Sequence, residues 1–351
     1  MSADDSACFH YRVKLPLFEL GSRDDFTNTR SNSLGIADFN KMDILYVQRA
    51  VSEDLLEYYK AVKRLGIKLI VDVDDDFFNI PPWNPAKEPW DDPKLKLKEL
   101  TAELYRIADA IFVSTHRLKH QLLSYNPNIA VLHNSFDSRR YANLTKPNLS
   151  KKPVIGFTIG PTHTVDLETI KPLVVSMALD PAVAIKALGM KTTGAAWPGI
   201  TFIEGVHFDI YHSVMNMMDW DLGLIGLAPC EFNEAKSPIK WMEYVMLGIF
   251  PIMSAVGPYK LVRSGIDGIL CKTEQEWINA IKFYVENPDQ RYIILAAARK
   301  RILENFSIQK TWKGWQKAIT NVLNNRPVED FCIDEACKYL DNNGYQQRMS
   351  L

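Results

Sequence analysis

The feature that most constrains this chain is a repeated alternation of short apolar runs with longer segments of helical periodicity. In the first half, residues 43–49 and 68–76 are apolar runs on either side of residues 52–66, where a serine and acidic residues mark the start of a helix. Further apolar runs at 110–115 and 129–134 continue the pattern. Such strand–helix–strand units form parallel sheets with crossover helices. The first half therefore predicts an α/β domain.

A second alternation begins after residues 138–152, a polar stretch of the kind that links domains. We expect strands at 153–160, 182–189, 201–206, 221–227, 250–254 and 267–271, and helices at 165–177, 211–218, 238–247, 273–286 and 289–304. The sequence therefore predicts two Rossmann-like domains, spanning residues 1–150 and 151–308.

The segment 309–326 has its own pattern. Trp312, Trp315, Ile319 and Leu323 recur at three- and four-residue spacing, which predicts a helix with one apolar face. That face needs a surface to pack against, and we expect the helix to cross back onto the N-terminal domain. The polar residues 327–351 are expected to form a tail.

Composition limits the classes of function. The chain has 351 residues, of which 47% are hydrophobic, so two full cores are expected. A formal net charge of -1 gives no overall attraction to nucleic acid or to an anionic membrane. The five cysteines are scattered and unlike a zinc site, and the sequence shows neither an export signal nor an apolar run long enough to span a membrane. We therefore expect a cytoplasmic protein.

The segment AKSPIKWMEYVMLG contains the clearest candidate for a ligand site. Ser237 is a favourable N-cap, Pro238 suits the first helical position, and Gly248 suits the helix end. The helix would follow the strand at 221–227 and so begin at the carboxyl edge of a parallel sheet, where α/β proteins bind ligands. Its free amides, its dipole and the charge of Lys236 favour an anion such as phosphate.

Glu243 lies within the same helix, on the face that carries Ile239 and Met246. A carboxylate there can accept two hydrogen bonds from ribose hydroxyls, each contributing about 1.5–3 kcal/mol because the acceptor is charged. The alternative is an ordinary surface glutamate paired with Lys240 or another base.

The turn GPTH follows the first strand of the second domain. Gly160 would allow the backbone to approach a ligand closely, and Thr162 and His163 can offer hydrogen bonds to phosphate or sugar. An ordinary strand-to-helix turn is the alternative.

An acidic cluster, Asp72 with Asp74, Asp75 and Asp76, lies at the end of the strand at 68–76. Close carboxylates repel one another unless they bind partners. The cluster could form a solvated structural turn. Asp72 and Asp74 could also hold a metal in an Asp-x-Asp transferase or serve a phosphatase, with Asp72 as nucleophile. The phosphatase interpretation leaves the second domain unexplained, and the Asp-x-Asp transferase fold has one nucleotide-binding domain rather than two.

Residues 221–259, with AKSP followed by a helix containing Glu-Tyr, resemble the donor-binding segment of retaining GT-B glycosyltransferases. More specifically, they resemble a bacterial and phage-type subgroup of the family 4-like, group 1 enzymes. Residues 11–16, 43–49, 71–86 and 155–168 match the same subgroup. The resemblance implies two Rossmann-like domains facing a central cleft, and retaining, metal-independent sugar transfer from a UDP- or GDP-linked donor without a further cofactor. The acceptor is open: a glycan, a metabolite, a protein or a modified nucleic-acid base.

The resemblance also implies a set of site residues, without a catalytic one. The donor-binding candidates are Gly160, Thr162, His163, Glu234, Lys236, Ser237, Pro238 and Glu243, and Lys191 is a second candidate for the diphosphate. The acceptor-side candidates are Arg12, Gln48, Arg49, Asp74, Asp75 and Asp76. The family motif has two glutamates eight positions apart, but Ala235 stands eight positions before Glu243. This departure motivates an alternative function, a non-catalytic nucleotide-sugar binding protein.

Overall fold

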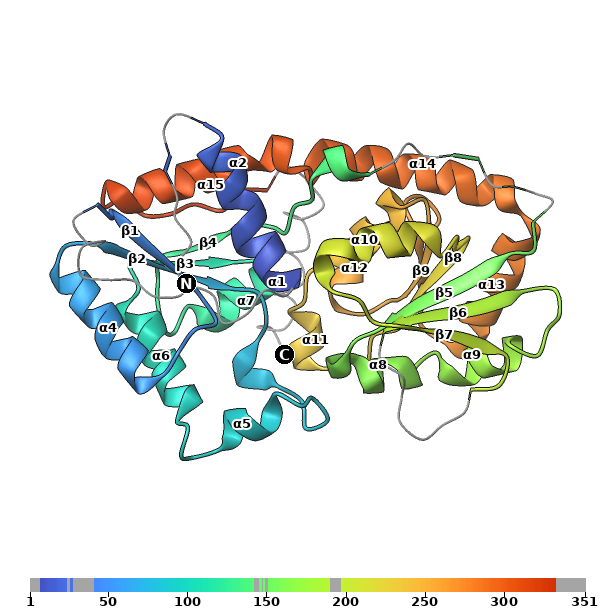
Figure 1. The fold of residues 1–351 in the computed structure, drawn as a ribbon, viewed down its shortest axis with the longest axis horizontal. Coiled ribbons are helices and arrows are strands. Elements are labelled where there is room, and N and C mark those ends of the chain that lie inside the picture. The colour runs from blue at the N-terminus through green and yellow to red at the C-terminus, as the bar shows by residue number, and fades with distance from the viewer. Residues whose placement is uncertain are drawn as a thin grey trace, which may run out of the picture.

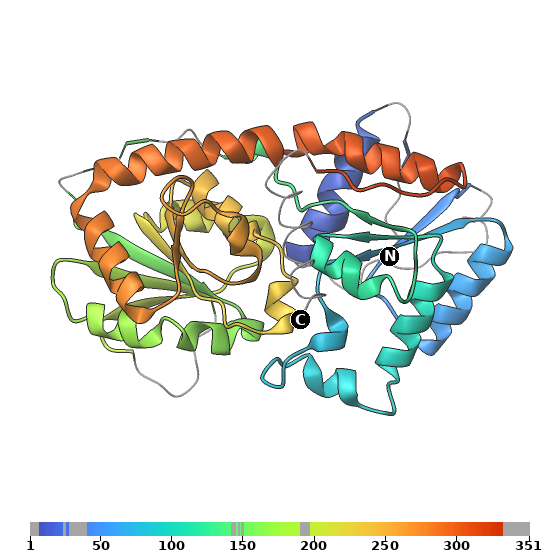
Figure 2. The same ribbon diagram turned by 180° about the vertical axis from the view of Figure 1, so that it is seen from behind.

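A computed structural model describes residues 7–23, 26–27, 41–141, 145–146, 148, 151–189 and 197–332. Two parallel β-sheets form the centres of two lobes that lie side by side (Figure 1). Helices cover the sheets, and a pair of long helices runs along one side of the molecule from lobe to lobe (Figure 2). The predicted architecture of two α/β domains is therefore confirmed.

The N-terminal lobe has a four-stranded sheet in the order β1-β2-β3-β4, with every neighbouring pair parallel. Its strands are β1 (Ile44–Gln48), β2 (Lys68–Val73), β3 (Ala110–Val113) and β4 (Ile129–Val131). Most of their residues are buried, which explains why the sequence shows continuous apolar runs instead of strict alternation. The register sets Gln48 beside Asp72, so polar residues meet where β1 and β2 end.

Helices connect these strands as the sequence predicts. They are α4 (Glu53–Arg64), α5 (Lys87–Asp91), α6 (Leu97–Ile107) and α7 (His116–Leu122), with short turns at η2 (Phe77–Asn79) and η3 (Ser138–Arg140). The hydroxyl of Ser52 accepts the Leu55 N–H at 3.2 Å and so caps α4.

A helical segment precedes β1. It consists of α1 (Ala7–Phe9), one π-helical turn η1 (His10–Lys14) and α2 (Leu15–Gly21). Leu20 on α2 packs with Trp315 and Ile319, so the segment is anchored to the N-terminal lobe. In both views its first turns lie beside the C-terminal lobe (Figures 1 and 2).

The C-terminal lobe has a six-stranded parallel sheet in the order β10-β9-β8-β5-β6-β7. Its strands are β5 (Val154–Ile159), β6 (Ala184–Gly189), β7 (Ile200–Glu204), β8 (Leu222–Ile225), β9 (Phe250–Ser254) and β10 (Ile269–Cys271). Its helices and turns are η4 (Pro161–His163), α8 (Thr164–Glu168), α9 (Lys171–Met177), α10 (Phe208–Met217), α11 (Glu231–Glu234), α12 (Ile239–Met246), η5 (Gly257–Leu261), α13 (Glu274–Glu286) and α14 (Pro288–Asn305). One prediction is wrong in detail: the helix expected at 165–177 is divided into α8 and α9, with Pro172 in the first turn of α9.

The last helix, α15 (Ile308–Leu323), returns to the N-terminal lobe, as predicted. Trp315 and Ile319 pack against Phe112 of β3. Where the chain passes from α14 to α15, Phe136 pairs with Ser307, and the Phe136 N–H donates to the Phe306 carbonyl at 3.1 Å. The two crossings between the lobes are thus hydrogen-bonded to each other.

The predicted tail needs correction at its start. Residues 327–332 extend along the N-terminal sheet: Phe331 pairs with Leu132, and the Asp330 carboxylate accepts the Val131 N–H at 2.8 Å. Residues 333–351 lie outside the described part of the chain. Among the described residues, no helix is both long and apolar enough to cross a membrane.

Candidate functional site

Contacts between the lobes gather around the start of α12. The Thr115 hydroxyl donates to the Ala235 carbonyl at 2.8 Å, and the Asn134 amide donates to the Ser237 hydroxyl at 2.8 Å. Lys236 reaches an acidic residue of the N-terminal lobe, and Glu243 accepts a hydrogen bond from the segment that precedes β1. The predicted ligand-binding helix therefore faces the other lobe, as the sequence interpretation requires.

The predicted cap of α12 is wrong. The helix begins at Ile239, Pro238 takes the cap position, and no side chain accepts a hydrogen bond from the first turn. The Ser237 hydroxyl instead accepts from Asn134 across the interface. Gly248 has a φ of +77°, the left-handed conformation expected of a glycine that follows a helix. The uncapped N–H groups of the first turn keep their positive potential.

Two lysines provide the positive charge at this position. Lys236 donates to Asp75 at 3.4 Å and lies 4.6 Å from the centre of the Phe232 ring. Lys240 makes no hydrogen bond and no ion pair with any residue that the structure describes, and burial lowers its pKa to about 8. The sequence analysis did not choose Lys240 as a ligand-binding residue. A signal was present: Lys240 stands three residues before Glu243, so the two share one face of the helix.

Glu243 is buried, with 6% of its surface exposed. The Tyr11 hydroxyl donates to Glu243 Oε1 at 2.6 Å, and His212 Nε2 lies 3.6 Å from the same oxygen. Among the described residues, no ion pair joins Glu243 to Lys240, and the burial of Glu243 does not favour the alternative of an ordinary surface glutamate. The buried carboxylate at the lobe interface agrees with the predicted position of a ribose-binding group.

The turn after β5 holds a hydrogen-bonded pair, His163 and Asp166. His163 Nδ1 lies 2.6 Å from Asp166 Oδ2, and the Ala228 N–H and the Asn233 amide both donate to Asp166 Oδ1 at 2.8 Å. The charge of Lys240, with burial, lowers the pKa of His163 to about 4, so the imidazole is neutral at pH 7. Its Nδ1–H then donates to Asp166, which leaves Nε2 as an acceptor.

The other predicted members of the turn take simpler positions. Thr162 is exposed. A Cβ on Gly160 would approach the His163 ring to 3.1 Å, so the glycine makes room for the imidazole. Lys191 lies outside the described residues.

The region before α12 contains no acid at the position that the family motif implies. Ala235 is fully buried, and its carbonyl accepts from Thr115. Glu234 pairs with Lys260 at 2.8 Å, and Glu231 pairs with Arg117 of the N-terminal lobe. The carboxylates of Glu231 and Glu234 are therefore used in ion pairs of their own.

Asp72 belongs to a closed, buried network. The Arg12 guanidinium donates to both Asp72 oxygens at 2.8 and 2.9 Å, and the Tyr46 hydroxyl donates at 2.6 Å. Arg12 also donates to the Leu132 carbonyl and to Asn134, and it is 0% exposed. Gln48 beside them is also 0% exposed. These side chains hold the lobe together, and their burial does not favour the predicted contact of Arg12 and Gln48 with an acceptor.

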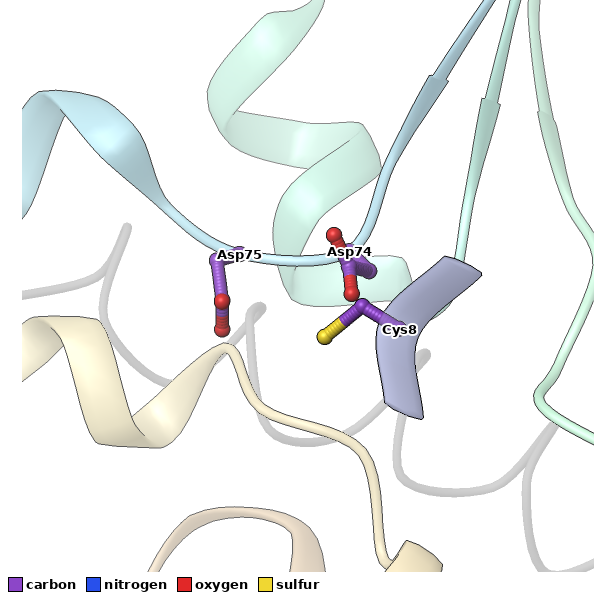
Figure 3. A group of neighbouring side chains, drawn as sticks. All are labelled: Cys8, Asp74 and Asp75. Atoms are coloured by element: carbon purple, nitrogen blue, oxygen red, sulfur yellow. The ribbon is translucent and has the colours of Figure 1, made fainter. Parts of the chain in front are cut away.

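The remaining acids surround a second arginine. Asp74 and Asp75 follow the end of β2, with Cys8 of α1 beside them (Figure 3). The Arg49 guanidinium donates to Asp74 at 2.9 Å, to Asp75 at 2.7 Å and to Cys8 Sγ at 3.1 Å. Arg49 has a φ of 56°, a strained conformation for a residue other than glycine.

These two networks bear on the metal and phosphatase interpretations. The sulfur and carboxylate oxygens of Cys8, Asp74 and Asp75 lie within 4.8 Å of one another, the spacing of metal ligands, but Arg49 already donates to all three. Asp72 is 1% exposed, so it does not reach a substrate as a nucleophile would have to. The geometry therefore gives no support to either interpretation. Asp76 is also buried, and it accepts from Asn79 and Gln121.

A small cavity of about 10 Å³ lies beside Trp315 and Phe331. It has room for about one water molecule. At the start of α12, side chains of the two lobes contact each other directly.

Comparison with known proteins gives a likeness of fold. No protein-family model and no curated protein sequence matches the chain. Among solved structures, a glycosyltransferase from Rickettsia africae is 14% identical, with 93% of this chain and 97% of that chain covered and a TM-score of 0.60. HepE of Anabaena in complex with UDP is 15% identical, with coverages of 81% and 80% and a TM-score of 0.60. The pneumococcal O-GlcNAc transferase GtfA in complex with UDP and GlcNAc is 13% identical, with coverages of 82% and 59% and a TM-score of 0.53.

These likenesses extend over both lobes and establish that the chain has the GT-B fold, as the resemblance of its motifs implies. At such low identity a shared fold does not carry an activity with it. The function must therefore be argued from the residues at the interface.

Proposed function

We propose that the chain is a glycosyltransferase that takes a sugar from a nucleoside diphosphate donor bound between the lobes, at the start of α12. The observation that carries the proposal is Lys240, a largely buried cation without a hydrogen-bond or ion-pair partner among the described residues. Keeping such a charge away from both water and a partner is costly, so its position favours an anionic ligand. HepE has been crystallised with UDP and with UDP-glucose, which supports a UDP-linked donor here.

Each group at this position matches a part of the donor. Lys236, Lys240 and the first amides of α12 would hold the diphosphate. Glu243, one turn further along the helix, would accept hydrogen bonds from the ribose hydroxyls. The neutral His163 can accept a hydrogen bond from a sugar hydroxyl through Nε2.

In the proposed reaction the bond between the anomeric carbon and the diphosphate oxygen breaks, and a bond to an acceptor oxygen forms as the acceptor loses its proton. The charge that develops on the leaving diphosphate would be stabilised by the two lysines and the helix amides, which are fixed before the reaction begins. No metal is needed for this role. From the sequence we also expect that the anomeric configuration is retained and that the protein is cytoplasmic. The acceptor stays open among a glycan, a metabolite, a protein and a modified nucleic-acid base.

Nucleotide binding is the first test. Calorimetric titration with UDP and with GDP should give saturable binding of one of the two. Glu243→Gln, which removes the charge and little volume, should weaken it about tenfold or more, since hydrogen bonds to a charged acceptor contribute about 1.5–3 kcal/mol each. An unchanged affinity in this variant would remove Glu243 from the site.

Turnover is the second test. Release of UDP or GDP from a panel of nucleotide sugars should continue in the presence of EDTA. Loss of turnover with EDTA would contradict the metal-independent scheme. Tight binding without any turnover or transfer would favour the alternative, a non-catalytic nucleotide-sugar binding protein.

A further inference from the structure

The π-helical turn His10–Lys14 directs two neighbouring side chains toward different lobes. Arg12 binds Asp72 inside its own lobe, whereas Tyr11 reaches Glu243 in the other. A π-helical turn is rare and occurs frequently at functional sites. The segment is therefore fixed on the N-terminal lobe by Arg12 while Tyr11 extends into the proposed nucleotide site.

The Tyr11 contact has the chemistry of a ribose contact. Tyr11 is 3% exposed, and burial together with the Glu243 carboxylate raises the pKa of its hydroxyl, so the hydroxyl stays protonated and donates. The distance of 2.6 Å is that of a hydroxyl bonded to a carboxylate. A ribose hydroxyl that approached the same oxygen from the same side would compete with the Tyr11 hydroxyl for that position.

A second contact imitates the other half of the donor. Asp75 Oδ1 lies 3.4 Å from Lys236 Nζ, and the charges of Lys236 and Arg49 hold the pKa of Asp75 below its ordinary value despite burial. Asp75 is thus an anion on one of the lysines that would hold the diphosphate. Figure 3 shows that it belongs to the turn that leaves β2, so it too is part of the N-terminal lobe.

We propose that Tyr11 and Asp75 are internal substitutes for the donor, which occupy its ribose and diphosphate positions until a nucleoside diphosphate displaces them. The inference rests on the proposed function. Donor binding then breaks two contacts between the lobes, and the measured affinity equals the intrinsic affinity multiplied by the fraction of molecules in which the two substitutes have left the site. Occupation of the site is thereby coupled to loss of the contacts that Tyr11 and Asp75 make with the C-terminal lobe.

The experiment is a titration of the full chain with UDP and GDP. Tyr11→Phe keeps the ring and removes the competing hydroxyl, and it should bind the nucleotide about tenfold more tightly, the effect of losing one hydrogen bond to a charged group. Asp75→Asn should tighten binding about threefold, because its longer contact is weaker. The double variant should combine both gains.

Matched controls separate competition from general effects. Tyr59→Phe removes another buried hydroxyl of the same lobe, one that donates to the Ala50 carbonyl, and should leave nucleotide affinity unchanged. Asp76→Asn removes a neighbouring acid that is bonded to Asn79 and Gln121, and should have less effect than Asp75→Asn. Thermal unfolding of each variant confirms that it is folded.

The outcomes are distinct. Unchanged or weaker binding by folded Tyr11→Phe would show that Tyr11 orients Glu243 for the ligand and would overturn the inference, while the proposed function would stand. If Asp75→Asn and Asp76→Asn change nucleotide affinity equally, the effect comes from the overall charge. The inference that Asp75 occupies the diphosphate position would then be overturned. If neither the natural chain nor Tyr11→Phe binds UDP or GDP, the nucleotide site is refuted and the substitutes with it.

Discussion

The facing sheet edges of the two lobes both carry charged clusters, but the clusters differ in how their charge is balanced. In the N-terminal lobe, Arg12 is bonded to Asp72, and Arg49 to Asp74 and Asp75. In the C-terminal lobe, Lys240 is left without a partner among the described residues. The acidic run is the more conspicuous in the sequence, yet most of it is neutralised within its own lobe. Unbalanced charge, rather than the density of charged residues, marks the better candidate for a ligand site.

The largest effect is expected from breaking the balanced cluster. Arg12→Met would leave Asp72 buried without its partner, and should lower the free energy of unfolding by about 3–5 kcal/mol. Urea unfolding of the variant measures the loss. Adding Asp72→Leu should restore part of the stability, because two apolar side chains can replace a buried ion pair.

A surface pair provides the control for this prediction. Lys60→Met removes a surface partner of Glu103, and should change the free energy of unfolding far less than Arg12→Met does, because solvent screens such a pair. If Arg12→Met costs no more than Lys60→Met, the N-terminal network does not have the structural role that we assign to it.

Lys240→Met tests the unbalanced cluster, and its two effects should have opposite signs. Nucleotide affinity should fall about tenfold, since a charged hydrogen bond to the diphosphate is lost. The free energy of unfolding should rise by about 1–2 kcal/mol, because a shift of one pKa unit corresponds to about 1.4 kcal/mol and solvent screens part of it. Calorimetry and urea unfolding measure the two. A variant that loses both affinity and stability would mean that Lys240 has a structural partner.

The pH dependence should distinguish the same lysine. The pKa of Lys240 is lowered to about 8, so its ammonium loses its proton as the pH rises through that value and UDP binding should weaken there. Its penalty to stability, present below pH 8, should fade between pH 8 and the ordinary lysine pKa near 10.5, where the unfolded chain still holds the proton. Titrations with UDP at pH values from 6 to 9.5 should show the loss of affinity near pH 8 in the natural chain and not in Lys240→Met. A step that persists in the variant would belong to another group.

The smallest effect is expected at a residue that the sequence placed in the site. Glu234 is paired with Lys260, so Glu234→Gln should change UDP affinity by less than about twofold and the free energy of unfolding by at most about 1 kcal/mol. A tenfold weaker affinity would return Glu234 to the donor site.

Sequence reasoning succeeded where local pattern decides structure. The apolar runs predicted the parallel strands because the inner strands of each sheet are buried on both faces, and the stripe containing Trp315 predicted the helix that returns to the N-terminal lobe. The position of Glu243 at the interface followed from its place on a helix at the carboxyl edge of a sheet.

The failures lie where a partner comes from elsewhere in the chain. Ser237 is a residue type that favours the helix cap, but its hydroxyl instead accepts a hydrogen bond from Asn134 of the other lobe. The contact of Tyr11 with Glu243 joins residues 232 positions apart, and no periodicity indicates such a pair. Lys240 was missed although its spacing was visible, because only the structure shows that it makes no hydrogen bond and no ion pair within the described part of the chain.

The hydrogen-bonded crossing at Phe136 and Ser307 has a mechanical consequence. The two chain segments that connect the lobes are bonded to each other at this one position beside α14 and α15. Rigid-body opening of the lobes is therefore restricted to rotation about a hinge axis near Phe136 and Ser307. Displacement in such a rotation grows with distance from the hinge axis. The loop that carries α5, on the opposite side of the molecule in both views (Figures 1 and 2), therefore sweeps the longest arc, and a label placed there would report opening most sensitively.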